Sequence, residues 1–227
     1  MEKSCSVWMR RLLALIKKDL TDEFRTRYAI NSLLLFAVIA LVMVSFATGM
    51  AGLSASLHAA LLWIILFFSA MSGMGRSFAK EQEKNTAPAL RLAAPPEIIF
   101  WGKLCFNTIL MLALAVLVLL MYIFLLNPSI GNLPLLVLLV LLGSVCLAGA
   151  STILAAIVSM AANQGTLLPI LSLPVLLPFF LVVINATQTA FQGAGFSQAA
   201  GSLLFLVSYA VVIITVSLLL FRHVWQD

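Results

Sequence analysis

Few residues of this 227-residue sequence could carry out chemistry, and their spacing argues against an active site. The two histidines, His58 and His223, are far apart, and Cys5, Cys105 and Cys146 lack the C-x-x-C spacing of zinc and redox sites. No G-x-x-x-x-G-K-[ST], H-E-x-x-H or G-x-S-x-G motif is present. We therefore expect no catalytic residue, no metal site and no nucleic-acid partner, and any ATP must be bound by another chain.

The charged residues gather in two segments, 1–27 and 76–103. The first holds seven of the thirteen Lys/Arg, and the second holds five of them and three of the eight acids. Residues 78–84 contain no Gly or Pro and favour a short helix, which Pro88 interrupts. The pair Pro95-Pro96 followed by Glu97 predicts the start of a second helix. Segment 76–103 is either such a helical handle or a solvated connector.

Composition places these segments around a membrane domain. Apolar residues make up 63% of the chain and charged residues 9%, which a soluble core of this size could not accommodate. We predict an all-α, single-domain polytopic membrane protein over 1–227, with a membrane domain over 28–221. Six apolar runs are long enough to cross a bilayer: 28–49, 58–75, 103–126, 133–161, 167–187 and 202–221.

Charge orients these spans. All thirteen Lys/Arg fall on one predicted face, whereas the opposite loops near 50–57, 127–132 and 188–201 carry none. The positive-inside rule then makes both termini, the tail 222–227 and loop 76–103 cytoplasmic. The connection 162–166 must also be cytoplasmic, because an even number of spans separates it from each cytoplasmic terminus, although it has no basic residue.

Segment 1–27 has the pattern of an amphipathic helix at the membrane interface, with its cations among anionic head groups. Two acids, Asp19 and Glu23, interrupt its apolar face one turn apart. They pair with basic residues of a partner or of loop 76–103, or they lie on a solvated second half of the helix. The apolar residues that recur every fourth position are Trp8, Leu12, Ile16, Leu20 and Phe24.

Two spans have distinctive patterns. The fifth contains Pro169, Pro174 and Pro178, each of which removes a backbone donor, so this span should be buried among its neighbours or beside a cavity. It is either a moving, cavity-lining element or a static kinked helix. The fourth span favours close helix packing, or a dimer contact, because small residues recur at intervals of four. They are Ser144, Ala148, Thr152 and Ala156.

Together these features resemble the permease subunits of ABC-2 type exporters. The loop pattern of that group, Phe-acid-acid-Thr-Leu-Pro-Lys, is matched in order by Phe78, Glu81, Glu83, Thr86, Leu92, Pro95 and Lys103. Within it, Leu173-Pro174-Val175-Leu176-Leu177-Pro178 and the span spacing resemble CcmB, the haem exporter protein B family of cytochrome c maturation. The sequence departs from that family at 163–166, which lacks the basic residues often found there.

The resemblance implies a bacterial inner-membrane permease, present as two copies and driven by a separate CcmA-like ATPase. CcmC-like and CcmE-like haem-handling proteins would be its other partners. Haem would be the transported or transiently handled species, with His58 as a candidate ligand, although a lone interfacial histidine is more often a solvated polar tip. The alternatives are an ABC-2 permease for a lipid, drug or polysaccharide, and a non-transporting scaffold. The residues expected to couple to the ATPase are Phe78, Glu81, Glu83, Lys84 and Arg91.

Overall fold

The computed structural model describes residues 2–49, 53–74, 78, 81, 86, 90, 92, 94–159 and 164–226. Within these residues the chain forms long helices and no strand. Six of the helices are long and apolar enough to cross a membrane, as the sequence predicted. The helices are α1 (Glu2–Thr26), α2 (Tyr28–Thr48), α3 (Ala55–Met74), α6 (Pro96–Leu126), α7 (Leu133–Ser159), α8 (Gln164–Phe191) and α9 (Phe196–Gln226).

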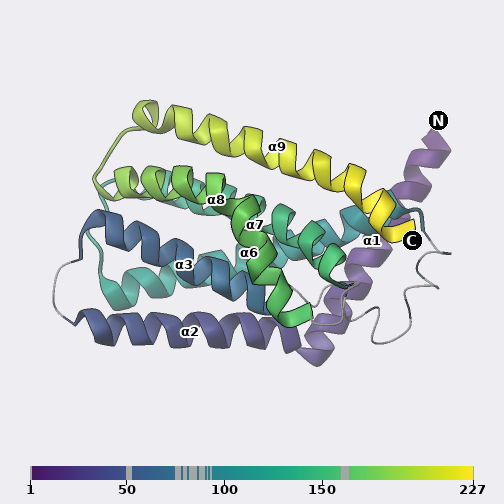
Figure 1. Cartoon of the computed structure of the whole chain (residues 1–227), viewed down its shortest axis with the longest axis horizontal. Coiled ribbons are helices and arrows are strands. Elements are labelled where there is room, and N and C mark those ends of the chain that lie inside the picture. The colour runs from purple at the N-terminus through teal and green to yellow at the C-terminus, as the bar shows by residue number, and fades with distance from the viewer. Residues whose placement is uncertain are drawn as a thin grey trace.

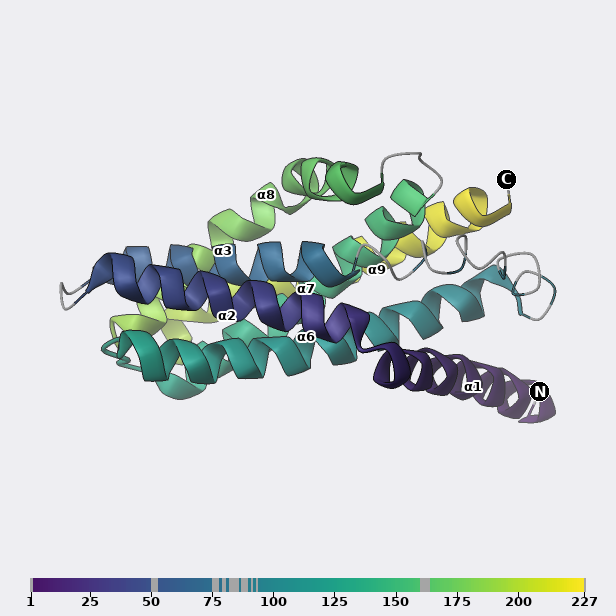
Figure 2. The same cartoon turned by 90° about the horizontal axis from the view of Figure 1, so that it is seen from below.

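The six apolar helices form an elongated bundle, and α1 lies across one end of it (Figure 1). Both chain termini, the end of α3 and the start of α6 are at that same end (Figures 1 and 2). The connections from α6 to α7 and from α8 to α9 are at the opposite end. The bundle therefore separates a charged end, which carries α1, from an end with short connections.

Helix α6 begins where the proline pair predicted a helix start. Pro95 is extended, with φ −64° and ψ 154°, and Pro96 and Glu97 occupy the first turn. The fixed φ of proline suits this position, and the acid complements the positive end of the helix dipole. The helix then continues without a break through the third span. Residues 96–103 are thus the first two turns of that span, not a separate helix of the loop.

Helix α7 lies at the centre of the bundle and packs against α3, α6, α8 and α9. Its small residues Ser144, Ala148, Thr152 and Ala156 are all buried. A close fit also occurs at Gly143, which lies against the ring of Trp63 from α3. Small side chains let the neighbouring backbones approach closely, which explains why this helix can contact four others.

Helix α8 is visibly bent (Figures 1 and 2), and it contains the three prolines Pro169, Pro174 and Pro178 within its length. Proline removes an i→i−4 hydrogen bond and is a common cause of such bends. Pro174 and Pro178 are exposed, so of the two predicted alternatives burial among the neighbouring helices does not hold within a single chain, and a position beside a cavity stays a prediction. The bundle covers only the face that carries Leu176, Phe179 and Val183.

Candidate functional site

The candidate site lies where α1 crosses the start of α6. Gly102 of α6 makes this close approach possible, because a Cβ at that position would lie 3.2 Å from Cβ of Leu15. The predicted apolar stripe of α1 does not face the bundle along its whole length. Leu12 is buried against the bundle, whereas Phe24 is 65% exposed. A repeat of four residues exceeds the 3.6 residues of a helical turn, so the stripe winds around the helix away from the bundle.

Asp19 of α1 and Lys103 of α6 form a buried ion pair at this crossing. The Lys103 Nζ lies 3.0 Å from Oδ2 of Asp19 and 3.1 Å from Oε1 of Glu81, which belongs to loop 76–103. All three residues are buried: Asp19 is 7% exposed, Lys103 5% and Glu81 6%. Of the alternatives for Asp19, pairing with a basic residue of segment 76–103 is therefore confirmed. One lysine joins α1, the loop and the third span.

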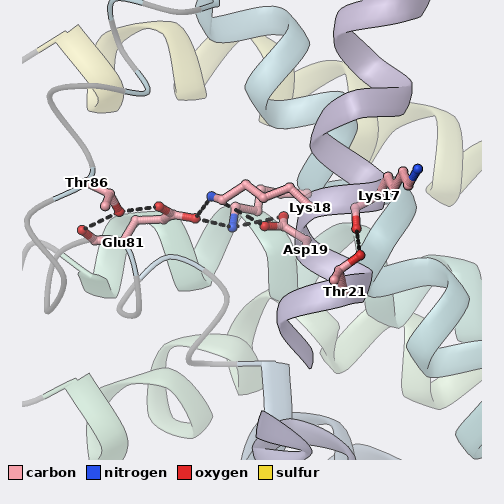
Figure 3. Close-up of polar contacts among 7 residues, drawn as sticks. Lys17, Lys18, Asp19, Thr21, Glu81 and Thr86 are labelled. Atoms are coloured by element: carbon pink, nitrogen blue, oxygen red, sulfur yellow. Dashed lines mark hydrogen bonds and ion pairs between the residues drawn. The ribbon is translucent and has the colours of Figure 1, made fainter. Parts of the chain in front are cut away.

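Glu81 has partners on both carboxylate oxygens. Oε1 also accepts a hydrogen bond of 2.6 Å from Lys18, and Oε2 accepts one of 2.5 Å from the Thr86 hydroxyl (Figure 3). Burial alone would raise the pKa of Glu81, but the charge of Lys103 and the hydrogen bonds from Lys18 and Thr86 outweigh it and lower the pKa to about 2. Glu81 is therefore ionised throughout the physiological pH range. We call Lys18, Asp19, Glu81, Thr86 and Lys103 the junction cluster.

The lowered pKa of Glu81 predicts an acid-sensitive contribution to stability. A carboxyl group with a depressed native pKa stabilises the fold above its unfolded pKa of about 4.5, and that contribution is lost as pH falls toward about 2. The unfolding free energy of Glu81→Gln should therefore lie below that of the parent at pH 6, and the gap should close between pH 4.5 and 2. Unfolding in detergent across this range checks it. A gap that does not change with pH would contradict the assigned ionisation.

Glu23, the second acid of α1, has a different position from Asp19. It is 4% exposed, and its Oε1 accepts a 3.1 Å hydrogen bond from the backbone N–H of Ile30 in the first turn of α2. Arg27, between the two helices, has a φ of 52°. A carboxylate at a helix N-terminus satisfies a free N–H and complements the helix dipole. Glu23 thus sets the angle at which the chain turns from α1 into α2.

An aromatic cluster lies beside the junction cluster. Nζ of Lys103 is 5.8 Å from the centroid of the Phe78 ring, which is fully buried. The Phe78 ring is 5.6 Å from that of Phe221 in α9, and Phe221 is 5.3 Å from Phe100 in α6. A cation over an aromatic face and tilted ring pairs both add attraction beyond the buried area. Loop residue 78 is thereby fixed to the ends of α6 and α9.

The predicted coupling residues do not form one exposed set in the structure. Phe78 and Glu81 point into the chain. Glu83, Lys84 and Arg91 lie outside the described residues. In contrast, Leu92 is 91% exposed, which makes it the most exposed large apolar side chain of the part of the chain that the structure describes. A coupling role for Glu81 stays a prediction, and Glu81 would exert it through Lys18 and Lys103 rather than through a free carboxylate.

His58, the candidate ligand, is neither a solvated tip nor free of partners. It is 7% exposed, and its Nδ1 lies 2.9 Å from the hydroxyl of Tyr122 in α6. That hydroxyl donates its own proton to the backbone carbonyl of His58 at 3.0 Å. The hydroxyl therefore accepts from Nδ1–H, which places the ring proton on Nδ1 and leaves Nε2 as the acceptor. This arrangement ties α3 to α6, and a ligand role for His58 stays a prediction.

Sequence reasoning did not single out Lys18 or Lys103 as structural residues. The available signal was the position of Asp19 on the apolar side of α1, because a buried carboxylate requires a cation. The loop segment supplies five cations, so the sequence did not show which of them would be the partner. In the structure Lys103 lies on α6, which holds it in place beside Asp19.

The fold and the site together define a multi-pass helical membrane protein whose charged end is organised by an internal ion cluster. The family model described as CcmB protein matches residues 10–224, nearly the whole chain. The chain therefore belongs to the CcmB family, a class of membrane permease subunits. No curated protein matches the sequence.

Proposed function

We propose that this chain is the membrane subunit of an ATP-driven complex that handles haem during the biogenesis of c-type cytochromes. The observation that carries the proposal is the CcmB family match over residues 10–224 on a bundle of six membrane-spanning helices. Energy comes from a separate CcmA-like ATPase, and CcmC-like and CcmE-like proteins receive or supply the haem. Haem is the transported or transiently handled species and is not held as a resident cofactor.

Loop 76–103 is the proposed contact for the ATPase. Leu92 supports this role, because an apolar side chain that is 91% exposed at the charged end is suited to a protein partner. Glu83, Lys84 and Arg91 are the docking charges, since Glu81 already has partners within the chain. Two charge reversals, Glu83→Lys and Arg91→Glu, test the docking contact without removing a member of the junction cluster.

The function is tested in a bacterial strain that lacks its own CcmB-family gene. The expected result is that this chain, expressed with its ATPase partner, restores c-type cytochromes with covalently attached haem, and that the ATPase co-purifies with it. Inserted protein that restores no cytochrome would overturn the haem assignment. Co-purification of the ATPase without cytochrome recovery would then favour an ABC-2 permease for a lipid, drug or polysaccharide, and no ATPase partner would favour a scaffold.

The charged end of the bundle is the proposed cytoplasmic side, and α1 lies in the membrane interface. Met9, Leu13 and Phe24 of α1 are 47%, 58% and 65% exposed, although they are apolar. Arg10 and Lys17 are exposed beside them. Apolar side chains flanked by cations match the boundary between acyl chains and anionic head groups.

Labelling with a membrane-impermeant thiol reagent in intact spheroplasts tests this orientation. A cysteine at Ser129, between α6 and α7, should react from outside, whereas one at Thr21 of α1 should react only after permeabilisation. Both side chains are exposed, so accessibility does not differ for structural reasons. Ser129 is preferable to Gly131, where a Cβ would collide with the backbone of Gly193. The reverse labelling pattern would place the charged end outside.

A second copy of the chain covers the exposed face of α8 in the proposed complex. This face carries the exposed prolines and also the exposed amide of Asn185. Proline frees backbone carbonyls, and both these carbonyls and an amide are disfavoured against lipid. A protein surface or a water-filled space between two copies supplies the partners that lipid lacks. Apolar neighbours on this face are Ile170, Leu173, Leu177 and Leu181, which are 63%, 47%, 54% and 62% exposed.

Replacing Pro174 or Pro178 with Ala tests whether α8 must bend. The expected result is a protein that inserts and assembles but matures less cytochrome, because alanine restores the missing N–H and straightens the helix. Haem-stained c-type cytochromes provide the measurement. Normal maturation in both variants would show that the bend is a static feature.

A further inference from the structure

Lys103 is placed to transmit movement as well as to neutralise charge. Its ammonium group contacts Asp19 of α1 at 3.0 Å and Glu81 of loop 76–103 at 3.1 Å, while its own backbone is in the third span. Among the described cations at this end, Arg10 and Lys17 are exposed, whereas Lys103 is buried. Asp19 of α1 is far in the sequence from Glu81 and Lys103, so side-chain contacts bring α1 to this point.

The junction cluster is electrically balanced, and three of its members, Asp19, Glu81 and Lys103, are buried. Two carboxylates face two ammonium groups, and Lys18, at 2.6 Å from Glu81, is the more exposed of the two lysines. Charges that are buried together resist separation, because each would have to be left without a counter-ion or be hydrated again. A displacement of Glu81 therefore carries Lys103 and Asp19 with it more readily than it breaks the cluster.

The aromatic cluster extends the connection to the last helix. Phe78 lies on the same loop as Glu81, under the Lys103 ammonium and against Phe221 near the end of α9. The loop is thus held at two points, one ionic and one apolar. The ionic contact joins Glu81 to Lys103 of α6 and to Lys18 of α1. The apolar contact joins Phe78 to Phe221 of α9.

We propose that Lys103 and Asp19 are positioning residues that make the loop at Phe78 and Glu81, α1 and the start of α6 move as one body. This inference rests on the proposed function, in which an ATPase displaces the loop. Movement of the loop then reaches α1 at the membrane surface at the same time as it reaches the third span. If the ion pair were only structural, its loss would lower stability alone. If it positions the moving parts, its loss also lowers the coupling of ATP hydrolysis to cytochrome maturation.

The decisive variant is the double substitution Asp19→Asn with Lys103→Met. It removes the α1–α6 ion pair without leaving a buried charge alone, since Glu81 keeps Lys18 and Thr86 as partners. Neutral replacement of both members of a buried pair is tolerated far better than loss of one member. Lys17→Met is the matched control, because it removes an exposed α1 cation next in sequence to the cluster.

The first experiment uses the purified chain alone and does not depend on transport. Spin labels at Leu13 of α1 and Glu97 in the first turn of α6, both exposed, report the distance between these two helices in a background without native cysteines. The parent and Lys17→Met should give one narrow distance distribution, and the double variant should lose it. A broad distribution in the parent, or an unchanged narrow one in the double variant, overturns the proposal.

The second experiment uses the complex with its ATPase. The double variant should still bind the ATPase and hydrolyse ATP, but cytochrome maturation should fall about tenfold or more, as expected for loss of a coupling energy between two sites. Lys103→Arg, which keeps the charge, should restore most of the maturation. Normal maturation in the double variant, or loss of ATPase binding, would overturn the positioning role.

Two further outcomes remain decisive. If the parent chain itself restores no cytochrome, the proposed function fails, and the spin-label distances alone decide whether the ion pair holds α1 to the start of α6. If the double variant inserts poorly, Asp19→Asn replaces it in both experiments. That single variant removes the direct contact between α1 and α6, while Lys103 keeps Glu81 as its counter-ion.

Discussion

Lys103→Met should be the most destabilising single substitution at the charged end of the bundle. It leaves the buried carboxylate of Asp19 without its 3.0 Å partner and deprives Glu81 of one of its two lysines. Removing one member of a buried ion pair costs about 3–5 kcal/mol, and the lower end applies here because Lys18 lies 3.7 Å from Asp19 and partly replaces the lost charge. Unfolding in detergent measures this free energy.

The double variant Asp19→Asn with Lys103→Met tests the reason for that loss. Its unfolding free energy should lie above that of Lys103→Met alone, because the unpaired carboxylate is gone. Lys17→Met should lie within about 0.5 kcal/mol of the parent, as is usual for exposed positions. A Lys103→Met protein as stable as the parent would mean that the buried cluster makes no net contribution to the fold.

The sequence predicted the membrane helices well because lipid imposes a simple requirement on each of them. A span needs about 20 apolar residues, and each of the six runs meets it. The start of α6 was also predictable, since the fixed φ of Pro96 and the charge of Glu97 act locally. The continuity of α6 was not predicted, because the charges of Glu97 and Lys103 place residues 96–102 outside the apolar run of the third span.

The site was predicted less completely than the fold because its contacts join distant parts of the chain. Lys18 and Glu81 are 63 residues apart, and no periodicity relates them. The sequence identified Asp19 as an acid on an apolar face, which narrowed its partner to a basic residue but not to Lys103. The exposure of Pro174 was missed for a related reason. The sequence shows which carbonyls proline frees, but not whether the same chain or a second copy covers them.

Gly143→Ala should be the most disruptive conservative change in the centre of the bundle. A Cβ at this position would overlap the ring of Trp63, with two further ring carbons, Cζ3 and Cζ2, at 2.9 and 3.0 Å. The ring cannot easily move. Its Nε1–H donates a 2.9 Å hydrogen bond to Oγ1 of Thr187 in α8, and it forms a T-shaped pair with the ring of Phe179 at a centroid distance of 5.5 Å. The substitution therefore strains the contact between α3, α7 and α8.

The expected loss for Gly143→Ala is about 1–3 kcal/mol of unfolding free energy, the usual cost of overpacking a well-filled core. This loss would occur although alanine favours helix formation by about 1 kcal/mol over glycine. Gly149→Ala in the same helix is the matched control. Its Cβ would meet only the flexible side chains of Ile213 and Ile214, at 3.3 and 3.5 Å, so it should be neutral or stabilising. Equal unfolding free energies for the two variants would contradict the close packing of Trp63 on Gly143, whereas a loss confined to Gly143→Ala would show that this indole ring fixes the spacing of three membrane helices.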